Sequence, residues 1–248
     1  KNDILDGRLN GTIRLGGTLD NPMAALDAVV AEGKAAGYEI RDMALDVKLA
    51  DHVVTIDELR GRQGDGFFAA KGRIPLDGAA MDAQFAANGI AAGMVAKAAG
   101  TDADVRGTIN LAVQFGGTLE NPQANASVEV KNGGVGASTF DDLTGLASLK
   151  DGVIDIEQLL VRKKLGERDY SASAKGKVPV RSLTAAADER LSASEQIDLT
   201  LALDDADLSL LPILSPAVEW ALGPTKGKVR VTGTLERPQF AGEVSLAD

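Results

Sequence analysis

One six-residue phrase occurs three times in this chain. It reads Gly17-Thr18-Leu19-Asp20-Asn21-Pro22, then Gly117-Thr118-Leu119-Glu120-Asn121-Pro122, and finally Gly233-Thr234-Leu235-Glu236-Arg237-Pro238. Each copy follows a stretch of alternating apolar and polar residues, at 12–15, 108–111 and 228–231. Pro22 and Pro122 are 100 residues apart, and Pro122 and Pro238 are 116 apart. A repeat of this length indicates one piece of β architecture used several times.

Alternation of apolar and polar residues continues on both sides of each phrase. Ile13, Leu15 and Leu19 share one parity, and we expect them on one face of a strand that runs from 11 to 19. Residues 43–49 alternate in the same way. Because proline has no N–H to donate, we expect Pro22 to end the ladder of its strand.

The segments between the phrases also repeat. Residues 54–59 match 154–159, and residues 71–76 match 175–180. We expect the strands at 143–149 and 153–161 to pair across Asp151-Gly152, and Asn132-Gly133-Gly134 to form a turn. The units are not joined by a linker rich in Ser, Gly and Pro. The sequence therefore predicts one sheet that extends as repeats are added.

Two segments interrupt the strand pattern. Residues 91–99 favour a short helix that stops at Gly100, and residues 208–222 are a second helical candidate, in which Trp220 would anchor the helix to the sheet. The polar stretch 181–194 is typical of an insertion loop. The repeats divide the chain into unit 1 at 1–104, unit 2 at 105–224 and the start of a truncated unit 3 at 225–248.

Composition and charge argue against several kinds of partner and site. The net charge is −10 and the pI about 4.7, which argues against nucleic acid and against adsorption to an anionic membrane. The chain has no cysteine, and no apolar run approaches the ~20 residues that span a bilayer. Because the chain starts at Lys1 and its third repeat stops at Asp248, we expect a segment of a longer protein.

Catalytic and metal-binding chemistry is poorly represented. His52 is the single histidine, so neither a metal site with several histidines nor a relay between two histidines can exist. The loop at 61–66 has glycine spacing faintly like a phosphate loop but lacks the Lys-Ser/Thr ending. The acids at 204–207 and at Asp141-Asp142 are better explained as solvated strand ends or turns than as a cation site or a glycosidase pair. Asp57-Glu58 and Glu157-Gln158 recur at equivalent places, which favours a structural or surface role over an acid–base pair.

What remains is strand after strand with one aliphatic face. An ordinary sandwich would bury such faces against a second sheet. An extended sheet that curls would leave a lengthwise groove of aliphatic side chains, in which each methylene of an acyl chain contributes about 0.8 kcal/mol on leaving water. Both arrangements fit the pattern.

These features together resemble the TamB family of translocation and assembly proteins, within the AsmA-like group. The resemblance rests on the tiled Gly-Thr-Leu-acid-X-Pro phrase, the paired strands ending in residues 56–62, and residues 71–76. It covers about residues 11–246. It implies an all-β, elongated, curled repeat sheet, the U-shaped "β-taco" with a hydrophobic groove and one or two short helices.

The resemblance also implies a function, which is not enzymatic and uses no cofactor or metal. Members of the family are periplasmic, anchored in the inner membrane of diderm bacteria, and meet a BamA-like outer-membrane barrel such as TamA. They move phospholipid between membranes or chaperone nascent β-barrel proteins. The groove positions that the resemblance and the alternation assign are Ile13, Leu15, Leu19, Leu45, Val47, Leu49, Ile56, Ile74, Ile109, Leu111, Val113, Phe115, Leu119, Ile154, Ile156, Val178, Leu199, Leu201, Leu203, Val229 and Val231.

Two other functions compete with a lipid conduit or chaperone. One is a structural or adhesive repeat of a surface protein, with a closed core in place of a groove. The other is a carbohydrate-active β-solenoid enzyme, which the low aromatic content of 4% and the single histidine disfavour.

Overall fold

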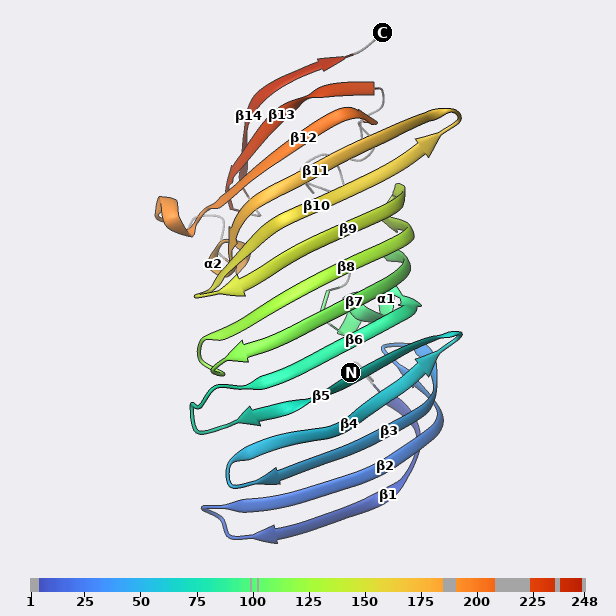
Figure 1. Cartoon of the computed structure of the whole chain (residues 1–248), viewed down its shortest axis with the longest axis vertical. Coiled ribbons are helices and arrows are strands. Elements are labelled where there is room, and N and C mark those ends of the chain that lie inside the picture. The colour runs from blue at the N-terminus through green and yellow to red at the C-terminus, as the bar shows by residue number, and fades with distance from the viewer. Residues whose placement is uncertain are drawn as a thin grey trace. The chain divides into compact units, whose positions relative to one another are not determined.

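The structure is a computed structural model that describes residues 5–98, 100–101, 103–184, 191–207, 224–234 and 237–246. These residues form fourteen strands in one antiparallel sheet, and the strands lie in the sheet in chain order from β1 to β14 (Figure 1). The order is open, since β14 is not a neighbour of β1. The prediction of an all-β fold built on one extending sheet is confirmed.

The chain divides into two compact units. The first comprises residues 1–103 and 108–124, and the second comprises 104–107 and 125–248. Unit A, as we call the first, holds β1 (Leu5–Gly17), β2 (Pro22–Ala35), β3 (Tyr38–Ala50), β4 (Val53–Gln63), β5 (Gly66–Pro75), β6 (Asp82–Ala91), α1 (Ala92–Ala98) and most of β7 (Val105–Gly117). Unit B, the second, holds most of β8 (Pro122–Val135), then β9 (Ser138–Lys150), β10 (Val153–Leu165), β11 (Arg168–Pro179), α2 (Val180–Thr184), the 3₁₀ turn Ala193–Glu195, β12 (Ile197–Asp207), β13 (Pro224–Gly233) and β14 (Pro238–Leu246).

The described residues of the repeated phrase make the same pair of hydrogen bonds in all three copies. In the second copy the Thr118 N–H donates to the Asn121 carbonyl over 3.1 Å, and the Asn121 N–H donates to Thr118 Oγ1 over 3.1 Å. Equivalent pairs join Thr18 to Asn21 and Thr234 to Arg237. Gly117 has a φ of +70°, in the left-handed region that glycine reaches without steric cost. The phrase therefore specifies a hairpin between two long strands.

Proline has a different role in this turn from the one predicted. Pro22 does not end its ladder but is the first residue of β2, opposite Gly17, and Pro238 opens β14 opposite Gly233. The first residue of a strand is a position where a missing N–H is tolerated. Leu19 and Leu119 lie in the turns after β1 and β7 have ended, so the expectation that they continue the strand face is wrong.

One-residue bulges interrupt β4 and β10 at equivalent places. In β4 the bulge contains Asp57 and Glu58, because Ile56 faces Gly72 while Leu59 faces Ala70. In β10 the bulge contains Glu157 and Gln158, between Ile156 opposite Gly176 and Leu159 opposite Ala174. An inserted residue bends a strand and shifts its side-chain alternation. This places the two recurring polar pairs in a structural role.

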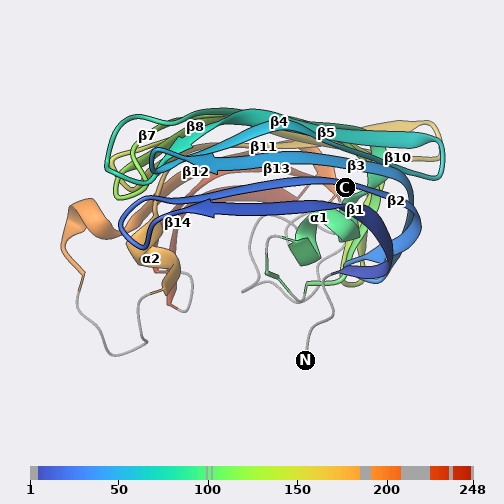
Figure 2. The same cartoon turned by 90° about the horizontal axis from the view of Figure 1, so that it is seen from below.

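The strands of unit A are strongly bent. Figure 2 shows β1, β2 and β3 turning toward the side of the sheet on which α1 lies. Irregular backbone accompanies the bend: the register shifts between Gly7 and Leu9 in β1, and Asp42 in β3 has a φ of +52°. Bulges and glycines are the usual means of curving a sheet. The predicted curl is therefore present within this unit.

Other sequence expectations have mixed outcomes. The short helix at 91–99 is confirmed as α1, and the strands of residues 143–149 and 153–161 pair across Asp151-Gly152 as predicted. The turn predicted at 132–134 is wrong, because these residues lie inside β8. Gly133 is buried, and a Cβ placed there would run into the Phe140 ring, so its glycine serves packing and not a turn. The predicted loop at 181–194 overlaps α2 at its start and the 3₁₀ turn at its end, and the helix predicted at 208–222 lies outside the described residues.

Candidate functional site: an aliphatic sheet face

In unit A, one face of the sheet is aliphatic on every strand. The printed registers connect side chains of one face from strand to strand, as in the row Ile13, Leu26, Val47 and Ile56. This aliphatic face consists of Leu9, Ile13 and Leu15 in β1; Ala24, Leu26, Ala28 and Val30 in β2; Met43, Leu45, Val47 and Leu49 in β3; Val54, Ile56 and Leu59 in β4; Phe68, Ala70 and Ile74 in β5; Ala83, Phe85 and Ala87 in β6; and Ile109, Leu111, Val113 and Phe115 in β7.

Unit B has an equivalent aliphatic face. Ala174, Leu201 and Val231 form a buried cluster there, with Leu159, Leu199 and Val229 packed against it. The face consists of Leu143, Ala147 and Leu149 in β9; Ile154, Ile156, Leu159 and Val161 in β10; Ala172, Ala174 and Val178 in β11; Leu199, Leu201 and Leu203 in β12; Val229 and Val231 in β13; and Phe240 and Val244 in β14.

The aliphatic face of unit A is only partly covered. All described strands belong to one sheet, so the described part of the chain has no second sheet to cover this face as in a sandwich. Leu45, Val47, Leu49 and Leu111 are half-buried, and Leu15 at the edge of the sheet is 80% exposed. At the bent end the face is closed: Val30 is 2% and Ile90 0% exposed, and α1 buries Met94 (Figure 2). The result is an apolar surface with one covered end.

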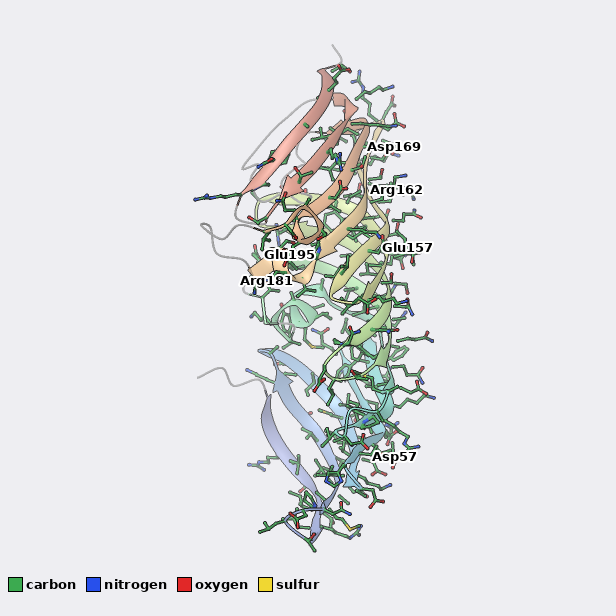
Figure 3. The ribbon with its side chains drawn as sticks, turned by 90° about the vertical axis from the view of Figure 1, so that its left-hand side faces the viewer. Asp57, Glu157, Arg162, Asp169, Arg181 and Glu195 are labelled. Carbon is green, nitrogen blue, oxygen red and sulfur yellow. The ribbon has the colours of Figure 1, made fainter. Side chains whose placement is uncertain are left out.

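The opposite face is polar and carries ion pairs between strands. The Arg230 guanidinium of β13 donates two hydrogen bonds, of 2.8 and 2.9 Å, to the Asp198 carboxylate of β12. The bond to the guanidinium lowers the pKa of Asp198, and the carboxylate raises the pKa of Arg230. In unit A, Lys48 lies 2.5 Å from Asp57 and 3.5 Å from Asp46, and these partners raise the lysine pKa. Figure 3 shows Asp57, Glu157, Arg162 and Asp169 on this face.

Most of the predicted groove residues share the aliphatic face of their unit. In unit A these are Ile13, Leu15, Leu45, Val47, Leu49, Ile56, Ile74, Ile109, Leu111, Val113 and Phe115. In unit B they are Ile154, Ile156, Val178, Leu199, Leu201, Leu203, Val229 and Val231. Leu19, fully exposed, and Leu119, 51% exposed, are not on the face, because each lies in a turn.

Sequence reasoning missed members of the face beyond the bulges and on β2. Leu59 follows Ile56 by three residues and Leu159 follows Ile156 by three, so strict alternation assigns both to the wrong side. The sequence did contain a sign of the two bulges, because their polar pairs lie 100 residues apart at equivalent places of the repeat. On β2, Ala28 pairs with Leu45 and Val30 pairs with Met43, which places both on the aliphatic face.

The described residues offer little other chemistry. They contain no cluster of three or more His, Asp or Glu that could hold a metal ion. His52 lies in the turn between β3 and β4 and is exposed. No helix in the described part of the chain is long and apolar enough to cross a membrane.

Comparison with known proteins gives no relative. No protein-family model, curated protein or solved structure matches this chain.

Proposed function

We propose that this chain is a non-enzymatic carrier of apolar chains, whose aliphatic sheet face holds the acyl chains of phospholipids. The observation that carries the proposal is the aliphatic face that continues across the neighbouring strands of each unit without a second sheet over it. Single exposed hydrophobics are ordinary, but a contiguous apolar surface marks an interaction site.

The physics of the face suits acyl chains better than a polar ligand. Apart from Phe68, its side chains are aliphatic over the rows from β2 to β5, so a bound chain meets mostly methyl and methylene groups along its length. Each methylene removed from water contributes about 0.8 kcal/mol, and no specific polar contact is needed. The polar opposite face keeps the rest of the sheet in water.

The resemblance to the TamB family supports a setting for this activity. On that basis we propose a periplasmic segment of an inner-membrane-anchored protein in a diderm bacterium, which carries phospholipid between the membranes and works with a BamA-like outer-membrane barrel. Chaperoning of unfolded β-barrel proteins on the same face is the related alternative. A structural or adhesive repeat, in which the face binds nothing, is the competing function.

Native mass spectrometry tests the proposal. The purified chain is incubated with phosphatidylethanolamine in a volatile detergent, and bound lipid is identified after release. We expect adducts of one or more phospholipid masses that survive detergent removal. An apo mass under all conditions, together with dye binding no stronger than that of folded control proteins, would favour the structural repeat.

A further inference from the structure

The hairpin β10–β11 of unit B carries charge that the repeat itself does not require. Both strands are two residues longer than their counterparts β4 and β5. Arg62, Gln63 and Gly64 end β4 and start its turn, whereas Arg162, Lys163 and Lys164 continue β10. Because the shorter hairpin builds the same fold, the added basic residues call for another explanation.

These residues line a pocket of about 550 Å³ where β9, β10 and β11 meet. Its lining includes three cations, Arg162, Lys163 and Lys164, and three carboxylates, Asp141, Asp142 and Asp169. Asp141 Oδ2 accepts a 2.6 Å bond from the backbone N–H of Lys164, which holds the end of β9 against the hairpin. Among the described residues, neither the Arg162 guanidinium nor the Lys164 ammonium forms an ion pair.

The pocket lies where the two faces of the sheet meet. Lys163 and Tyr170 face each other two positions beyond Val161 and Ala172, so alternation places them on the aliphatic face of unit B. Val161 and Ala172 are 0% and 1% exposed. Arg162 and Asp169 lie on the polar face (Figure 3). A molecule bound here can contact both the aliphatic face and separate positively and negatively charged side chains.

We propose that this pocket binds the zwitterionic head group of a phospholipid, a phosphodiester linked to a short ammonium arm. Arg162 and Lys164 would bind the phosphate, and Asp142 and Asp169 would bind the ammonium. This inference rests on the proposed function: the four charged groups share the polar face at the strand ends, and Lys163 and Tyr170 line the same pocket from the aliphatic face, where the acyl chains would lie. Cations and carboxylates in equal number match a ligand with both charges, whereas an anionic head group would leave the carboxylates opposed to it.

Paired variants test the site. Arg162→Gln with Lys164→Gln removes the two phosphate partners, and Asp142→Asn with Asp169→Asn removes the ammonium partners. Arg62→Gln is the matched control, because Arg62 holds the position in β4 that Arg162 holds in β10. Circular dichroism establishes that each variant is folded.

Three lipids are compared on each protein: phosphatidylethanolamine, phosphatidylglycerol and uncharged diacylglycerol. We expect the Arg162/Lys164 variant to bind phosphatidylethanolamine about tenfold more weakly and diacylglycerol unchanged, as loss of charge-assisted bonds predicts. We expect the Asp142/Asp169 variant to lose its preference for phosphatidylethanolamine over phosphatidylglycerol. Arg62→Gln should behave as the wild type.

Soluble probes separate this inference from the proposed function. Glycerophosphoethanolamine and inorganic phosphate are titrated while the amide signals of residues 141–142 and 162–171 are followed by NMR. Shifts with the head group and much weaker ones with phosphate support the site, even if no lipid is carried. Lipid binding that all variants share would overturn the site and leave the carrier function standing, and equal affinity for phosphate would overturn the zwitterionic preference.

Discussion

At the start of each repeated turn, glycine is required both because a Cβ atom would have no room and because the backbone angle φ is positive. A Cβ on Gly117 would run into the Asn121 carbonyl oxygen, and the φ of +70° is itself costly for other residues. By contrast, a Cβ on Gly116 would find its nearest neighbour, the Met81 carbonyl oxygen, 3.9 Å away. The first glycine of the phrase and the glycine just before it thus carry different constraints.

We predict that Gly117→Ala destabilises the chain by at least about 1–2 kcal/mol, the cost of a left-handed conformation for a residue with a Cβ. The clash with Asn121 adds to this. Gly116→Ala is the control and should change stability little. Urea unfolding followed by circular dichroism measures both, and equal midpoints for the two variants would contradict the turn geometry.

The Arg230–Asp198 pair gives a pH dependence with a defined sign. Since Arg230 lowers the pKa of Asp198 in the folded state, the pair stabilises the fold fully above the ordinary aspartate pKa of about 3.9. That stabilisation is lost as the pH falls through the lowered pKa. We predict that Asp198→Asn lowers the melting temperature slightly at pH 7, and that the difference from wild type shrinks below about pH 4. A difference that grows on acidification would contradict the pairing.

At the scale of the strand, aromatic rings take the place of side chains that glycines lack. Gly61 of β4 faces Phe68 of β5, and a Cβ on Gly61 would lie 2.5 Å from the ring tip. Phe140 covers Gly133 in the same manner in unit B. A ring laid over a cross-strand glycine is a known way to stabilise such a site. Both pairs lie among buried residues.

We predict that Gly61→Ala destabilises the chain by about 1–3 kcal/mol, as overpacking of a filled site does. The loss should be smaller in a Phe68→Leu background, because the ring is what the new methyl group meets. A double-mutant cycle with thermal unfolding measures this coupling. Additive effects of the two substitutions would show that the ring and the glycine do not interact.

The strands were predictable where alternation is regular and not where it breaks. Ile13, Val47 and Leu111 were assigned to one face from parity alone, and the registers place them there. Alternation assigned Leu59 to the wrong face, because a bulge adds one residue to β4 before it. The presence of that bulge depends on backbone geometry. The turn predicted at Gly133 was wrong because the sequence alone does not show whether a glycine makes room for an aromatic ring or allows a turn conformation.

At the scale of the whole chain, the sequence predicted one continuous sheet but not the polar pocket of unit B. The sheet followed from repeats that keep their strand pattern without linkers. The pocket depends on how three strand ends converge, and Asp141-Asp142 alone looked like a turn pair. Residues from separate strands can be assigned to one pocket only when the strand registers are known.

Leu111→Asp and Ala112→Asp separate an open face from a closed core. The two residues are neighbours in β7 on opposite faces, with Leu111 half-buried and Ala112 exposed. We predict that Leu111→Asp keeps most of the strand signal in circular dichroism but binds phospholipid about tenfold more weakly, because the charge repels acyl chains from its row. Ala112→Asp should bind as the wild type does. Global unfolding by Leu111→Asp alone would identify the face as a closed core.

The agreement of strand order with chain order has a consequence for how the molecule is made. Each strand bonds to the one just before it, so a strand that emerges from a ribosome or a translocation channel finds its partner already laid down. No early strand has to wait for a distant one, and the loop to be closed at most steps is a short hairpin. The described sheet can thus be assembled from its amino-terminal edge in step with synthesis, with each new strand added at one growing edge.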